Sequence, residues 1–127
     1  MKLSEVVHHL EASVLAGGER LGREAIGAYA ADLLSDVLKK TLPDAVLLTG
    51  LTNPQVVRTA EIMDLAAVVF VRNKRVTPDI IALAAEKGLV LLGTRRSLYE
   101  SCGLLYRAGL PPVPSPGTGE GTDDADA

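Results

Sequence analysis

Three short apolar runs lie between Pro43 and Gly109, and each is followed by a polar corner and then by a helix-like stretch. The runs cover residues 45–48, 66–71 and 89–92. None of them alternates apolar with polar residues, as a strand with one face in water would. Both faces of such strands must be covered, which is typical of a parallel sheet between helices. The sequence therefore predicts an α/β protein with three layers, α/β/α, around a mainly parallel sheet of about four or five strands.

Capping residues and glycines mark the expected helix boundaries in this part of the chain. Asn53 and Thr77 are each followed by a proline, which suits the first helical position. Ser97 stands three residues before a glutamate, the spacing of a capping box. Gly88 and Gly109 stand where left-handed helix ends are expected. These signals predict three successive βα units.

The segment before these units is less regular. Residues 3–10 carry apolar side chains at positions i, i+3, i+4 and i+7, which predicts a helix. Residues 13–16 and 25–30 predict two short strands. Asp32 is expected to cap a helix over the following eight residues. One long helix over 28–40 fits this region as well.

Composition sets the domain limits and argues against a nucleic-acid partner. All 13 Lys and Arg lie before Pro111, whereas four of the 16 acidic residues lie after it. The first 110 residues therefore carry a charge of about +1, without the basic excess that nucleic-acid binders show. We expect one α/β domain over residues 1–110. Residues 111–127 are rich in Pro, Gly and Asp and are expected to form a disordered tail.

The cysteine and histidine residues predict neither a disulfide nor a metal site. Cys102 is the single cysteine, which fits a reducing compartment, and its apolar stripe predicts a buried residue. His8 and His9 are adjacent on a helix, about 100° apart, and are expected to be surface residues rather than metal ligands. No run is long enough to cross a bilayer and no signal peptide is visible. We expect a cytoplasmic protein without metal, cofactor or membrane partner.

The carboxyl ends of the predicted parallel strands form a candidate site for a small anion. Ligands bind at this edge of open α/β sheets, and the free N–H groups of helix N-termini favour anions. Arginine side chains at the corners supply positive charge. The candidate residues are Thr49, Gly50, Asn53, Arg72, Thr94, Arg95, Arg96 and Ser97. Helix capping and ordinary wet loops explain the same residues, and this simpler explanation is preferred.

An apolar surface for self-association is the second candidate site. A short chain with 47% hydrophobic residues and wholly apolar strands leaves a patch exposed if its outer helices are unpaired. The expected interface lies at the end of the second strand and on the helix after it. Its residues are Tyr29, Leu33, Leu34, Val37 and Leu38.

Residues 27–37, 65–70 and 93–100 together resemble the DRTGG domain family, especially its small stand-alone members. The similarity runs over residues 1 to about 110 in the right order. The resemblance implies a three-layer α/β/α fold similar to the N-terminal domain of HPr kinase, frequent dimerisation, and a regulatory role. The pentapeptide that names the family, Asp-Arg-Thr-Gly-Gly, is absent. The resemblance implies no agreed catalytic residues, so we carry none over from the family.

These observations predict a non-catalytic regulatory or interaction module. It is expected to form a homodimer and to sense a small anionic metabolite or nucleotide, or to bind a protein partner. The alternative is a small enzyme that acts on a phosphorylated metabolite at the same sheet edge. Kinase chemistry is disfavoured because no G-x-x-x-x-G-K-[ST] loop is present. No Asp, Glu or His lies within the Thr49 or Thr94 corners of the sequence, so we expect no proton-transfer group there.

Overall fold

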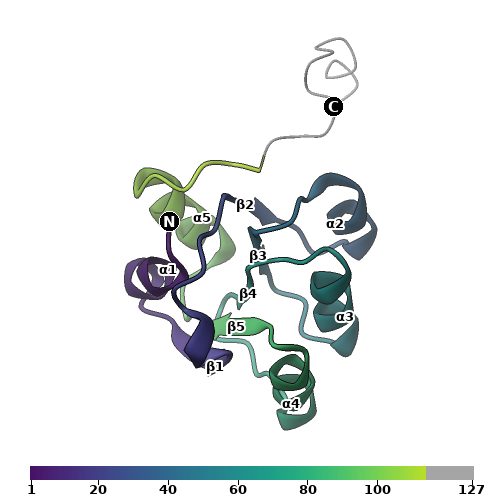
Figure 1. The fold of residues 1–127 in the computed structure, drawn as a ribbon. Coiled ribbons are helices and arrows are strands. Elements are labelled where there is room, and N and C mark those ends of the chain that lie inside the picture. Colours follow the sequence, from purple (N-terminus) through teal and green to yellow (C-terminus); the bar gives the residue numbers. More distant parts are fainter. Residues whose placement is uncertain (114–127) are drawn as a thin grey trace.

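The computed structural model describes residues 1–113 and contains a five-stranded sheet between two layers of helices (Figure 1). The strand order is β1-β5-β4-β3-β2; β1 runs antiparallel to β5, and the other neighbours are parallel. The predicted α/β/α architecture with a mainly parallel sheet is therefore confirmed. Along the chain the elements are α1 (Leu3–Leu10), β1 (Ser13–Ala16), the 3-10 helix η1 (Gly18–Arg20), β2 (Gly27–Ala30), α2 (Leu34–Lys40), β3 (Ala45–Thr49), α3 (Pro54–Ile62), β4 (Ala67–Phe70), α4 (Pro78–Lys87), β5 (Val90–Gly93) and α5 (Leu98–Arg107).

The three predicted βα units are β3–α3, β4–α4 and β5–α5, and their boundaries follow the capping residues. Asn53 accepts hydrogen bonds from the backbone N–H groups of the next helix, as an N-cap does. Ser97 accepts one from the N–H of Glu100 at 3.1 Å, but the Glu100 carboxylate binds an arginine instead of completing the capping box. Gly88 ends α4 in the left-handed conformation, with φ of 71°.

The expected cap at Asp32 is wrong. The N-cap of α2 is Leu33, and the Asp32 carboxylate binds groups at the end of β3 instead. One long helix over 28–40 is wrong as well, because Ala28 pairs with β3 in the sheet. Contacts with a distant strand here override the local capping preference of the aspartate.

Alternate residues of the parallel strands enter two separate cores. On one face, Val46 and Leu48 of β3 pack with residues of α1 and α5. On the other face, Ala45 and Leu47 pack with residues of α2, α3 and α4. All four side chains are essentially inaccessible to solvent. This burial on both faces is the physical reason that the strands do not alternate in sequence.

The two faces of the sheet are unequally covered. Three helices, α2, α3 and α4, lie on one face, and only α1 and α5 lie on the other (Figure 1). The segment after α5 passes along the outer edge of β2. There the N–H of Ala28 donates to the Pro111 carbonyl at 2.9 Å, and the N–H of Val113 donates to the Ala28 carbonyl at 3.1 Å. The remainder of the expected tail, 114–127, lies outside the described residues.

Within residues 1–113, no helix has the length and hydropathy that a bilayer crossing requires.

Candidate functional site

The connections that leave β4 and β5 lead to helices on opposite faces of the sheet. In α/β sheets such a divergence opens a crevice in which ligands bind. Here two backbone hydrogen bonds join the loops across it. The N–H of Arg72 donates to the Arg96 carbonyl at 2.8 Å, and the N–H of Asn73 donates to the Thr94 carbonyl at 2.9 Å. The N–H groups of Arg72 and Asn73 are therefore not free for a ligand.

Asp32 places a carboxylate of the chain itself at the end of β3. Its Oδ1 accepts hydrogen bonds from the Thr49 hydroxyl and from the Gly50 N–H, both at 2.9 Å. The Gly50 N–H bond, the Thr49 bond and the attraction of Arg72 and Lys74 lower the pKa of Asp32 against the opposing effect of burial. The Asp32 carboxylate thus occupies the position at which we expected a bound anion.

Arg72 lies over this corner in a left-handed backbone conformation that residues other than glycine rarely adopt. Its φ is 64° and that of Asn73 is 53°, so two successive non-glycine residues are left-handed. A Cβ atom added to Gly50 would lie 2.8 Å from Nη2 of Arg72. Residue 50 therefore has to be a glycine for the guanidinium to approach the end of β3 in this way.

Arg96 is held by two carboxylates at the neighbouring corner. Its Nη1 lies 2.5 Å from Glu100 Oε2, and its Nη2 lies 2.8 Å from Glu11 Oε1. The buried hydroxyl of Thr94 donates to the carbonyl of Leu10 at 2.9 Å. These contacts tie the end of β5 to α1 and leave Arg96 little charge for a ligand.

The eight predicted anion-site residues divide into two corners. Thr49, Gly50 and Arg72 surround Asp32, whereas residues 94–97 lie after β5. Asn53 and Ser97 cap their own helices, as the simpler explanation predicted. Arg95 is exposed, and no ion pair of it is found among residues 1–113.

Two carboxylates from outside the corner segments reach these corners through the fold. Asp32 comes from a position 17 residues before Thr49, and Glu11 comes from a position 85 residues before Arg96. Contacts at such separations leave no local pattern in the sequence. Each carboxylate is bonded to a neighbour, and the lowered pKa keeps Asp32 ionised, which makes it a weak proton acceptor.

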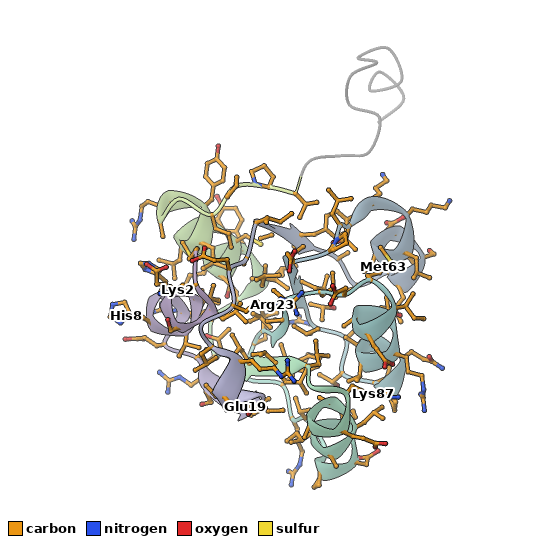
Figure 2. The ribbon with its side chains drawn as sticks, in the orientation of Figure 1. Lys2, His8, Glu19, Arg23, Met63 and Lys87 are labelled. Carbon is orange, nitrogen blue, oxygen red and sulfur yellow. The ribbon has the colours of Figure 1, made fainter. Side chains whose placement is uncertain are left out.

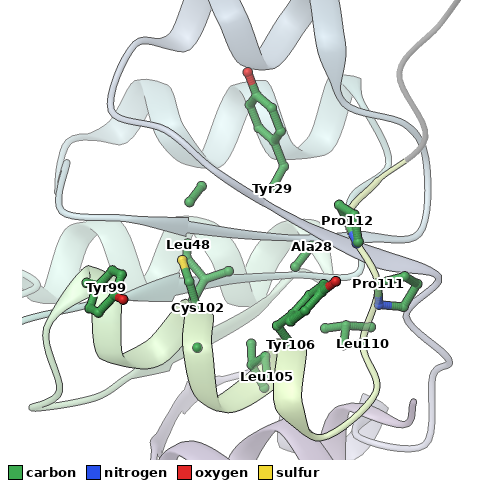
Figure 3. A pocket seen from close by; sticks show the side chains of 12 residues that line it. Ala28, Tyr29, Leu48, Tyr99, Cys102, Leu105, Tyr106, Leu110, Pro111 and Pro112 are labelled. Carbon is green, nitrogen blue, oxygen red and sulfur yellow. The ribbon is translucent and has the colours of Figure 1, made fainter. Parts of the chain in front are cut away.

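A second region, the α5 groove, was not predicted. It is an open apolar depression of about 340 Å³ between α5, the β2 end of the sheet and the segment after α5 (Figure 3). Its lining residues are Ala28, Tyr29, Ala30, Leu48, Tyr99, Cys102, Gly103, Leu105, Tyr106, Leu110, Pro111 and Pro112. It lies on the face that only two helices cover.

Small residues create the α5 groove. Ala28 and Ala30 line it from β2, and Gly103 lines it from the middle of α5. A Cβ atom added to Gly103 would have no neighbour within 4 Å, so nothing in the described residues packs there. A glycine inside a helix costs about 1 kcal/mol relative to alanine. The helix therefore carries a destabilising residue at a position where its own packing does not require one.

Cys102 points its sulfur toward Leu48 within the groove (Figure 3). It is half-buried rather than fully buried as we expected, and this burial raises the pKa of its thiol. The thiol is therefore protonated at neutral pH, which disfavours a nucleophilic role.

The predicted self-association residues do not form one surface, because some are buried in the core and others are exposed. Val37 is fully buried in the core and offers no surface, whereas Leu33 is 60% and Leu38 is 47% exposed. Tyr29 belongs to β2, but its ring points away from α5 (Figure 3) and packs on the core beneath α2–α4, as Leu34 does. A surface on α2 therefore depends on Leu33 and Leu38.

His8 is exposed and points outward from α1, away from the sheet (Figure 2). Within residues 1–113, no group of three or more His, Cys, Asp or Glu side chains is arranged to hold a metal ion.

Comparison with known proteins gives one family and one fold. The model of the DRTGG domain family matches residues 5–108. Among solved structures, the chain is similar to the CBS and DRTGG domains of the regulatory region of Clostridium perfringens pyrophosphatase, a complex with the activator diadenosine tetraphosphate. The TM-score is 0.70 at 12% identity, a level that establishes the fold alone. The match covers 91% of this chain but only 51% of that one. A search of curated proteins gives no significant match.

Proposed function

Because the chain belongs to the DRTGG domain family, we propose that it is a non-catalytic regulatory module that acts as a cytoplasmic homodimer. The observation that carries the proposal is the α5 groove, an apolar surface bordered by two largely exposed tyrosines. Clustered exposed apolar surface of this kind marks interaction sites. The similar domain of the pyrophosphatase lies in a regulatory region, which supports a regulatory role.

The carboxyl edge of the sheet favours association over catalysis as the main function. The N–H groups of Gly50, Arg72 and Asn73 at this edge are bonded internally. The carboxylates of Asp32, Glu11 and Glu100 are bonded to neighbouring side chains or backbone. An enzyme acting on a phosphorylated metabolite needs a free acid or base beside its anion site. Asp32 is ionised and bonded to two donors, so it does not supply one.

Sedimentation equilibrium over about a hundredfold range of protein concentration tests the proposed homodimer. We expect a species of twice the 13.3 kDa chain mass, in equilibrium with the monomer at low concentration. A single species of monomer mass over the whole range would contradict the proposal.

Sensing of a small anionic metabolite or nucleotide is a second candidate function. It is favoured by Arg72, Lys74 and Arg95, which are exposed on loops at the same sheet edge. Calorimetric titration with ATP and with diadenosine tetraphosphate tests it. We expect Arg72→Ala to abolish the binding heat and Lys39→Ala, which removes an exposed charge on α2, to leave it unchanged. The absence of heat from the wild type at millimolar ligand would exclude this function.

A further inference from the structure

Helix α5 carries an exposed stripe in addition to the one that packs on the sheet. Ser101 and Leu105 are buried against the core. The second stripe consists of Tyr99, Cys102, Gly103 and Tyr106, all of which line the α5 groove. We call these four residues the tyrosine stripe. Their spacing is i, i+3, i+4 and i+7, the pattern of a helix face that packs against a partner.

The tyrosine stripe has a spacing that is the same in both chain directions. Its large residues stand at the two ends, and its two small residues stand in the middle. Two copies placed antiparallel, with a two-fold axis between positions 102 and 103, set Tyr99 opposite Tyr106 of the second copy. An isologous interface requires this kind of self-complementary surface.

On this surface two protruding tyrosine side chains flank a depression formed by small residues. Tyr99 is 90% exposed and Tyr106 is 72% exposed, and both border the groove (Figure 3). Cys102 and Gly103 between them add little bulk. Two helices lie about 8–10 Å apart, axis to axis, and small residues at the contact allow the shorter distances in this range. In this register the rings of Tyr99 and Tyr106 meet across the interface, on either side of the point where the small residues let the two helices approach.

We infer that a second copy of this chain occupies the α5 groove, with the two α5 helices antiparallel about that two-fold axis. The inference rests on the proposed homodimer and assigns its interface. Each copy contributes the same two rings and the same two small residues, so the interface closes and no further copies add to it.

The charges on α5 fit an antiparallel pair. Glu100 stands in the first turn and Arg107 in the last turn. In the antiparallel arrangement Glu100 of one copy, which also pairs with Arg96 of its own chain, comes within two residues of the register of Arg107 of the other, an axial offset of about 3 Å. Arg107 is exposed, and residues 1–113 provide no ion-pair partner for it. A parallel pair would instead place like charges together.

The chemistry of the groove favours a protein surface over a small molecule. Small-molecule sites combine an apolar lining with a few convergent polar groups that fix the ligand. Here the polar side-chain atoms are the tyrosine hydroxyls and the Cys102 thiol, and the Tyr29 ring points away from α5. An unrelated protein partner would not account for the symmetric spacing of the stripe.

Gly103→Leu tests the inference without removing a folding contact. The position is open, and leucine has a higher helix propensity than glycine, so we expect this variant to fold, with a raised melting temperature at concentrations where both proteins are monomeric. Its side chain fills the depression, and we expect the dimer dissociation constant to rise at least about tenfold, with a similar loss for Tyr106→Ala. Ile62→Ala is the matched control, because Ile62 is 72% exposed on α3 at the opposite face. We expect it to dimerise like the wild type.

The single cysteine reports the position of the axis. In the proposed dimer the two Cys102 thiols lie near each other, so a short bis-iodoacetamide, applied above pH 9 because the raised pKa slows alkylation at pH 7, should join two wild-type chains. We expect no covalent dimer from Cys102→Ser and a strongly reduced yield from Gly103→Leu.

The outcomes separate the assigned interface from the homodimer itself. If the wild type dimerises but Gly103→Leu and Tyr106→Ala dimerise equally well, the α5 interface is refuted while the proposed function stands. Loss of the dimer in a Leu33→Ala, Leu38→Ala double variant would then place the interface on α2. A wild type that is monomeric at all concentrations refutes both.

Discussion

Asp32 joins the segment between β2 and α2 to the end of β3, and its removal should weaken the fold measurably. Asp32→Ala leaves the Thr49 hydroxyl and the Gly50 N–H without the carboxylate that accepts their hydrogen bonds. Thr49 is fully buried, so water does not easily replace this acceptor. Asp32→Asn keeps an acceptor oxygen of the same shape and removes only the charge. The two variants together separate the hydrogen bonds from the electrostatics.

The expected magnitude follows from the number and exposure of these bonds. A hydrogen bond to a charged group contributes about 1.5–3 kcal/mol, and a buried group left without a partner costs about 1–3 kcal/mol. Because the carboxylate itself is exposed, we take the low end and expect Asp32→Ala to lower the free energy of unfolding by about 2 kcal/mol. This corresponds to a decrease of about 8 °C in Tm for a domain of this size. Asp32→Asn should cost less than about 1 kcal/mol.

Urea denaturation of the wild type and both variants at several pH values provides the assay. The folded pKa of Asp32 is lowered below its ordinary value of 3.8. Its ionised form therefore stabilises the fold at pH values above that value, and the stabilisation is lost as the pH falls through the lower, folded pKa. The advantage of the wild type over Asp32→Asn should be constant near neutral pH and disappear in acid. Equal stability of wild type and Asp32→Ala at pH 7 would refute the role assigned to these bonds.

Three further predictions concern other parts of the fold. Thr94→Val leaves the Leu10 carbonyl without its buried donor and should lower the free energy of unfolding by about 1–2 kcal/mol in urea denaturation; an unchanged midpoint would contradict this. Gly27→Ala places a Cβ atom 2.9 Å from the Pro111 carbonyl, so amide exchange along the outer edge of β2 should accelerate, and unchanged protection would argue against the contact. Because burial raises the Cys102 pKa above 9.0, its alkylation should be slow at pH 7 and should still accelerate above pH 9, whereas a plateau below that pH would contradict the assignment.

The sheet could be predicted from sequence because its signal is local. The run at residues 66–71 is apolar throughout since both faces of β4 are covered, and Asn53 caps α3 through its nearest neighbours. Asp32 was misassigned for the opposite reason. Its local pattern is that of a cap, but its partners lie on a strand reached only through the fold. The separation in sequence between a residue and its partners, rather than the residue type, decided which of these predictions was confirmed.

The two candidate sites differ in the same way. The loop residues at the sheet edge could be predicted, because the ends of parallel strands share one edge, but the carboxylates that occupy it could not. The α5 groove depends on how many helices cover each face, a property of topology. One signal in the sequence would have found it: Tyr99 and Tyr106 are seven residues apart on a helix whose core stripe lies elsewhere. Tyrosines on a second helix face indicate an interface.

Dilution of isotope-labelled protein, followed by amide NMR spectra, tests the central claim most directly, namely that two copies associate through α5. If they do, the amides of the tyrosine stripe, Tyr99 to Tyr106, and of Ala28 and Ala30 beside it should shift as the dimer dissociates, while those of α3 stay constant. Shifts confined to α2, or spectra that do not change with concentration, would contradict the account.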